Sequence, residues 1–66
     1  MIPKFEINEL VAVRINDNQY KISRINLLFI DVNLKSIRYK LQDDDRLYLE
    51  NQIITYCEFC NKYDIN

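Results

Sequence analysis

The residues best suited to metal binding or redox chemistry are two cysteines near the end of the chain, Cys57 and Cys60, which form a Cys-x-x-Cys motif. Two thiolates at this spacing can share a metal ion or form a redox pair. The chain has no histidine and no third cysteine, so a tetrahedral metal site would need carboxylates such as Glu58 or Asp64, or a second copy of the chain. Neither proline nor glycine separates the cysteines, and no helix is predicted after them, which argues against a thioredoxin-like role. We therefore expect inert, reduced thiols and no cofactor, with a disulfide or a metal shared across a dimer as the alternatives.

No other group of residues predicts catalysis. A chain without histidine lacks the side chain that most often serves as a general base near neutral pH, and its hydroxyl nucleophiles are Ser23, Ser36, Thr55 and the tyrosines. The acidic run from Asp43 to Asp45 lacks the glycine-containing spacing of a calcium loop, so we interpret it as a solvated turn. The expected function is therefore non-enzymatic.

Basic residues are concentrated in one part of the chain. Residues 10–41 carry six Lys or Arg against two Asp, a net charge of +4, whereas residues 42–66 carry two against six acidic residues, a net charge of −4. We expect an electrically lopsided molecule whose basic face binds a nucleic acid or steers a protein partner. The competing interpretation is that outward strand positions are polar anyway. The candidate surface residues are Lys21, Arg24, Lys35, Arg38 and Lys40, with Tyr48 as an exposed aromatic anchor.

The elements that must position these residues are short alternating strands, predicted at residues 10–15, 20–30, 37–41, 47–49 and 53–56. The third strand has the cleanest alternation, with Ile37, Tyr39 and Leu41 inward and the basic residues between them outward. The second strand changes phase along its length, so a bulge or sharp bend is expected near Ser23 to Asn26. The polar residues 50–52 are of the right number for one tight helical turn.

The start of the chain is expected to complete the core. Val11, Val13 and Ile15 share one face of the first strand, and the opposite face, with Leu10, Ala12 and Arg14, is expected toward solvent. Phe5 and Ile7 are expected to close one end of the core. The chain has no glycine, so its eight asparagines are expected to supply the left-handed turn positions.

The C-terminal residues are harder to assign. A helix from Glu50 to Tyr63 competes with the strand prediction, but the consecutive β-branched residues 53–55 disfavour it. We predict one domain, residues 1–66, with a core from about residue 5 to residue 56 and a mixed tail at residues 57–66. No apolar run approaches the length needed to cross a bilayer.

Several segments together carry a resemblance to a known fold. They are Phe5, Ile7-Asn8-Glu9-Leu10-Val11, Tyr20-Lys21-Ile22-Ser23-Arg24-Ile25, Ile37-Arg38-Tyr39-Lys40-Leu41 and Leu49-Glu50-Asn51-Gln52-Ile53. In this pattern the chain resembles small Src-homology-3-like (SH3-like) barrels of the Tudor-like or KOW-like type, including many small phage and mobile-element proteins. The resemblance implies an all-β fold, a small five-stranded SH3-like barrel. Such folds carry many functions, so the resemblance alone does not select one.

The function that we expect is a non-enzymatic binding module. Heavy use of Ile, Asn, Lys and Tyr is typical of AT-rich coding, as in many phages. We expect the 66 residues to be a complete small protein that acts through its surface. The leading expectation is a cytoplasmic phage or mobile-element protein, monomer or homodimer, that binds and modulates or inhibits a host protein complex, as anti-CRISPR-like inhibitors do. The alternatives are an RNA-binding or single-stranded-DNA-binding barrel and a structural or assembly subunit.

Overall fold

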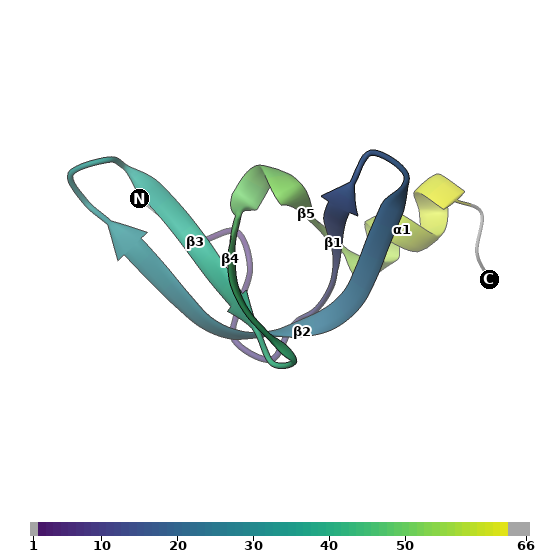
Figure 1. The fold of residues 1–66 in the computed structure, drawn as a ribbon, viewed down its shortest axis with the longest axis horizontal. Coiled ribbons are helices and arrows are strands. Elements are labelled where there is room, and N and C mark those ends of the chain that lie inside the picture. The colour runs from purple at the N-terminus through teal and green to yellow at the C-terminus, as the bar shows by residue number, and fades with distance from the viewer. Residues whose placement is uncertain (1, 64–66) are drawn as a thin grey trace.

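The computed structural model describes residues 2–63 and is mostly antiparallel β-sheet. A 3-10 turn, Glu50–Gln52, separates the fourth strand from the fifth. The elements are Leu10–Asn16 (β1), Gln19–Asp31 (β2), Ser36–Leu41 (β3), Asp44–Leu49 (β4), Ile53–Thr55 (β5) and a short helix, Tyr56–Tyr63 (α1). The sheet order is β4-β3-β2-β1-β5, and β4 and β5 do not pair within the described residues, so the curved sheet of Figure 1 is open. The five predicted strands and the turn at residues 50–52 are confirmed.

The long strand β2 gives the sheet its curvature. Its first half, up to Arg24, pairs with β1, and its second half, from Ile25, pairs with β3. The register shifts between Ile25 and Leu27, which leaves Asn26 as an extra residue at the bend. This is the bulge predicted from the change of phase. Beyond the bend, the hairpin of β2 and β3 extends away from the rest of the sheet (Figure 1).

The core lies inside the curve of the sheet. Ile37, Tyr39 and Leu41 are buried there, as their alternation predicts. Asn8 has a φ of 71°, so an asparagine does take a left-handed position here, and Lys35, which was not expected to do so, has a φ of 52°. The complete set of buried residues in the core cluster is Phe5, Val11, Val13, Ile25, Ile37, Tyr39, Leu41, Tyr48 and Ile53.

Three exposure predictions are wrong. Tyr48 is buried, with 5% of its surface exposed, because it pairs with Tyr39 and shares its inward face. Its hydroxyl donates to the Asp44 carboxylate at 2.6 Å, which satisfies the polar end of the ring. Ala12 is fully buried because α1 contacts β1 and β5 and covers the face that was expected toward solvent. Ile7 is 48% exposed, so it does not close the end of the core together with the buried Phe5.

Within the described residues, the predicted tail is helical as far as Tyr63 rather than mixed, and Asp64 lies outside the described part of the chain. The helix begins at Tyr56, after β5, and not at Glu50 as the competing interpretation had it. The Thr55 hydroxyl accepts a hydrogen bond from the Glu58 amide at 3.0 Å, and the Glu58 carboxylate accepts one from the Thr55 amide at 3.3 Å. This reciprocal pair is a capping box, which stabilises the start of a helix. No helix within residues 2–63 is long and apolar enough to cross a membrane.

Candidate binding surface

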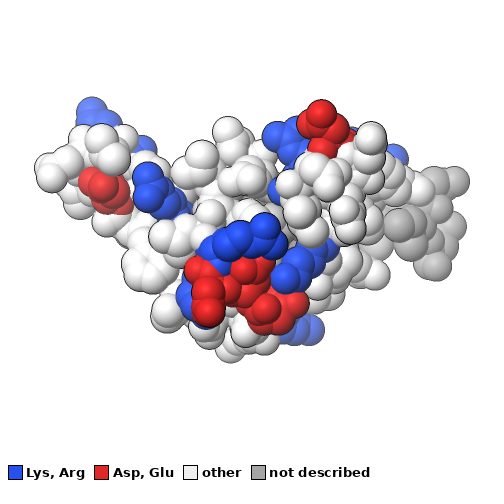
Figure 2. All heavy atoms as spheres, in the orientation of Figure 1, with Lys and Arg blue, Asp and Glu red and all other residues white. Residues whose placement is uncertain are grey.

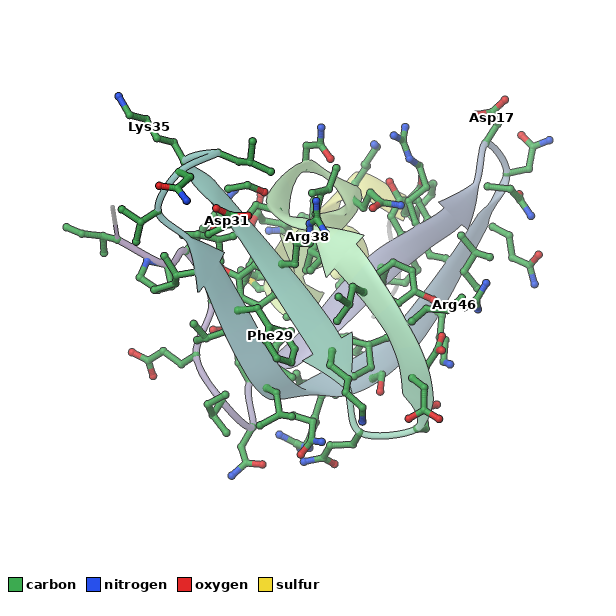
Figure 3. All side chains as sticks on the ribbon, turned by 60° about the vertical axis from the view of Figure 1, so that its left-hand side comes forward. Asp17, Phe29, Asp31, Lys35, Arg38 and Arg46 are labelled. Atoms are coloured by element: carbon green, nitrogen blue, oxygen red, sulfur yellow. The ribbon has the colours of Figure 1, made fainter. Side chains whose placement is uncertain are left out.

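One face of the three strands β2, β3 and β4 points away from the core. Residues paired directly across strands lie on the same face of a sheet, and here two such rows cross the three strands. Each row places a basic residue of β3 between two apolar residues of β2 and β4. The rows are Phe29–Arg38–Leu49 and Leu27–Lys40–Leu47. We call these six residues the outer face. Figure 3 shows Phe29 on β2 and Arg38 on the neighbouring strand β3.

The outer face is unusually apolar for a surface in contact with water. Its four apolar side chains are between 43% and 47% exposed. Antiparallel strands with one solvated face normally alternate apolar inward and polar outward positions. Contiguous exposed apolar side chains with polar neighbours are typical of interaction sites. The outer face is therefore the candidate binding surface of this molecule.

Arg38 lies beside a hollow in this surface. The hollow has a volume of about 380 Å³ and is lined by Phe29, Ile30, Asp31, Val32, Arg38 and Leu47. None of the ion pairs within residues 2–63 involves Arg38. The Asp31 carboxylate, which lines the same hollow, accepts a hydrogen bond from the Leu34 amide at 3.1 Å. The hollow thus combines apolar walls with a guanidinium group that is available for binding.

The five basic residues proposed from the sequence do not form one face. Arg38 and Lys40 lie on the outer face, and Lys35 lies in the turn between β2 and β3. Lys21 pairs with Val13 in the register of β1 and β2, so its side chain shares the face of the core residue Val13 rather than pointing to solvent. Arg24 donates to the Asn8 carbonyl oxygen at 2.8 Å.

Acidic residues neutralise much of this basic charge. The Lys21 amine lies 3.2 Å from the Asp43 carboxylate and 3.5 Å from Asp44, and the Lys40 amine lies 3.6 Å from Asp45. Acidic and basic side chains consequently lie side by side near the turn between β3 and β4 (Figure 2). The expected separation of charge is lost at Lys21 and Lys40, because folding brings the acidic run against these two residues.

The acidic run is also not a simple solvated turn. Asp44 belongs to β4, and its carboxylate accepts hydrogen bonds from Arg46 and from the Tyr48 hydroxyl. These two donors hold the pKa of Asp44 well below its usual range. The Ser23 hydroxyl donates to Asp43 at 2.7 Å and, with Lys21, lowers the pKa of that carboxyl. Asp44 therefore anchors the start of β4.

A second group of aromatic residues joins α1 to the β1–β2 hairpin. Tyr20 is one of the aromatic residues among the basic positions of the sequence, but its ring lies 5.4 Å from Phe59 and 5.6 Å from Tyr63. Phe59 and Tyr63 are themselves 5.0 Å apart. Centroid distances in this range mean that the three rings pack on one another. Tyr20 thus packs against the helix and holds it to the β1–β2 hairpin.

The two cysteines lie one turn apart on α1. Cys57 is exposed, Cys60 is half-buried, and they are not joined to each other. Among the described residues, no three His, Cys, Asp or Glu side chains gather closely enough to hold a metal ion. The Cys-x-x-Cys motif therefore consists of two free thiols on one helix.

The sequence did carry a signal for the outer face that residue types alone did not reveal. Residues 27–30 are apolar at consecutive positions, so any strand through them must expose two apolar side chains unless something covers it. Leu47 and Leu49 alternate with Tyr48, and the burial of Tyr48 forces both leucines outward.

Comparisons with protein families, curated proteins and solved structures find no match for this chain.

Proposed function

We propose that the protein is a non-enzymatic binding module that recognises another protein through its outer face. The observation that carries this proposal is the group of four half-exposed apolar residues, Leu27, Phe29, Leu47 and Leu49, around two basic residues. Aromatic and arginine residues are enriched where protein interfaces gain most of their binding free energy. The outer face offers one of each, side by side.

The fold that we propose for this module is an SH3-like barrel, in which the curved sheet is the barrel wall. The sheet order β4-β3-β2-β1-β5, the bend in β2 and the 3-10 turn before β5 support this assignment. The composition supports the further proposal of a cytoplasmic phage or mobile-element protein whose partner is a host complex.

Nucleic-acid binding is the less favoured alternative. Single-stranded nucleic acids are bound by exposed rings and by cations free to contact phosphates. Of the aromatic and basic residues in this part of the chain, Tyr39 is buried, Tyr20 packs against α1, and Lys21 and Lys40 lie within ion-pair distance of aspartates. Phe29 and Arg38 remain exposed and adjacent, a single ring beside a single cation. These contacts favour a protein partner.

Photo-crosslinking at single positions tests the proposed function. Phe29 is replaced by the photoreactive analogue p-benzoylphenylalanine, and the protein is irradiated in extract from its native cells. Tyr56, an aromatic residue of α1 that is 40% exposed against 46% for Phe29, provides the matched control position. We expect a discrete protein to be captured through Phe29 and not through Tyr56. Capture of nucleic acid through Phe29, or of the same protein through both positions, would contradict the proposal.

A further inference from the structure

We infer that the outer face binds a protein segment in which an Asp or Glu side chain lies between apolar side chains, with Arg38 receiving the carboxylate. This inference rests on the proposed function and specifies the chemistry of the partner. It follows from what surrounds Arg38 and from the charges that face it.

The first step is the position of Arg38. It lies at the centre of its row, between Phe29 and Leu49, and it lines the hollow with the apolar residues Ile30 and Leu47. A partner that covers the apolar residues of this face also removes water from the guanidinium group between them. An arginine that loses its hydration without gaining a counter-charge carries a large desolvation cost. A partner for this face must therefore supply a negatively charged hydrogen-bond acceptor.

The second step is that Arg38 has no ion-pair partner among residues 2–63. Asp31, the acidic residue among those that line the hollow, accepts a hydrogen bond from the Leu34 amide and makes no ion pair with Arg38 within the described chain. The other basic residue of the outer face, Lys40, faces Asp45, a fully exposed side chain at 3.6 Å. Pairs of this exposed kind stabilise weakly. The six residues of the outer face thus carry two positive charges and no negative charge, so the complementary charge is negative.

The third step is the shape of the acceptor. A guanidinium group presents parallel N–H donors that match the two oxygens of a carboxylate, and such charge-assisted pairs are among the strongest hydrogen bonds. The apolar residues on both sides of Arg38 and Lys40 select flanking apolar side chains. A nucleic-acid backbone, with a charge at every nucleotide and polar sugars between its phosphates, fits this pattern poorly. An acidic residue flanked by apolar ones fits both rows.

The test begins with selection from a library of short random peptides displayed against the immobilised protein. We expect the selected peptides to share an Asp or Glu between apolar residues. The best peptide and its amide counterpart, with Glu replaced by Gln, are then synthesised and titrated. Replacing the carboxylate by an amide is expected to weaken binding about tenfold or more. Against the Arg38→Gln protein, the two peptides are expected to bind almost equally, since the carboxylate has lost its partner.

Control variants separate this inference from the proposed function. Lys35→Gln removes a basic residue from the same hairpin but not from the outer face, and it should leave the preference for the acidic peptide intact. If binding is lost in Phe29→Ser or Leu47→Ser while acidic and amide peptides bind alike, the carboxylate inference is overturned and the proposed function stands. Peptides that bind regardless of Phe29→Ser, phosphopeptides preferred over carboxylates, or a library without binders would each overturn the inference.

Discussion

Tyr39 links three parts of the chain through one hydroxyl group. Its ring is fully buried and packs edge-on against Phe5, with ring centroids 5.5 Å apart. Its hydroxyl donates to the Glu50 carboxylate at 2.5 Å and accepts from the Phe5 amide at 3.4 Å. Glu50 in turn accepts from the Lys4 amide at 2.8 Å. Burial first, and then the Glu50 hydrogen bond, raise the pKa of Tyr39 from 10.0 to about 12.

Removal of this hydroxyl should reduce stability and change its dependence on pH. Tyr39→Phe leaves the Phe5 amide without its hydrogen-bond acceptor and removes one of the two hydrogen bonds that Glu50 Oε2 accepts, the other coming from the Lys4 amide. We therefore expect a loss of about 1 to 3 kcal/mol near neutral pH. Because the folded-state pKa is raised, the stabilisation from the neutral hydroxyl is complete below pH 10.0 and is lost as the pH rises toward about 12. Urea unfolding across this pH range should show that the difference in free energy of unfolding between wild type and Tyr39→Phe becomes smaller as the pH rises.

The control for this prediction is Tyr56→Phe, which removes a hydroxyl from a tyrosine that is 40% exposed. This variant should remain close to wild type near neutral pH. A constant difference between wild type and Tyr39→Phe throughout the alkaline range would contradict the assigned role of the Tyr39 hydroxyl.

At the scale of elements, α1 depends on its first turn and on one aromatic cluster. The helix has eight residues, which is too short to be stable in isolation. The Thr55–Glu58 capping box holds its start, and the packing of Phe59 and Tyr63 on Tyr20 holds its apolar side. Loss of the cap should therefore loosen the helix and uncover Ala12.

Thr55→Ala tests the cap. We expect it to lower the free energy of unfolding by about 1 kcal/mol and to weaken the nuclear Overhauser contacts between the rings of Tyr20 and Phe59. Thr55→Ser keeps the hydroxyl that accepts from the Glu58 amide, so it should retain most of the stability. Equal losses in Thr55→Ala and Thr55→Ser would mean that the β-branched side chain, and not the hydrogen bond, is what matters here.

At the scale of the whole molecule, the important result is that opposite charges come together. The basic part and the acidic part of the chain meet where Lys21 faces Asp43 and Asp44. A surface with neighbouring charges of both signs attracts a nucleic acid weakly, since each aspartate repels the phosphates that its lysine would attract. This arrangement permits a direct test of the alternative function.

Titration with short single- and double-stranded oligonucleotides should give no binding at about 50 mM salt, a low ionic strength that favours electrostatic binding. Fluorescence anisotropy measures this directly. The triple variant Lys35→Glu, Arg38→Glu, Lys40→Glu provides the control. Tight binding by wild type that falls steeply with salt and disappears in the triple variant would favour the nucleic-acid alternative over a protein partner.

Local patterns in the sequence determined the strands and part of the core. The alternation over residues 37–41 predicted that Ile37, Tyr39 and Leu41 point inward, and the β-branched residues 53–55 predicted a strand. The change of phase in β2 located its bulge. Each of these signals arises between residues close together in the sequence. The spacing of Thr55 and Glu58 in the sequence also fits a capping box, but the β-branched residues 53–55 favoured the prediction of a strand over that of a helix.

Which faces are covered was decided only by the tertiary structure. A period of two residues shows which side chains share a face, but it cannot show what lies over that face. Register with β3 turned Tyr48 inward and left Leu47 and Leu49 outward, and α1 buried Ala12. The same folding brought Asp43 to Lys21 from a distant part of the chain and left Arg38 without an ion pair in the described molecule. The candidate site depends on these long-range contacts, and for that reason composition and spacing pointed to a basic face where the folded chain presents an apolar one around Arg38.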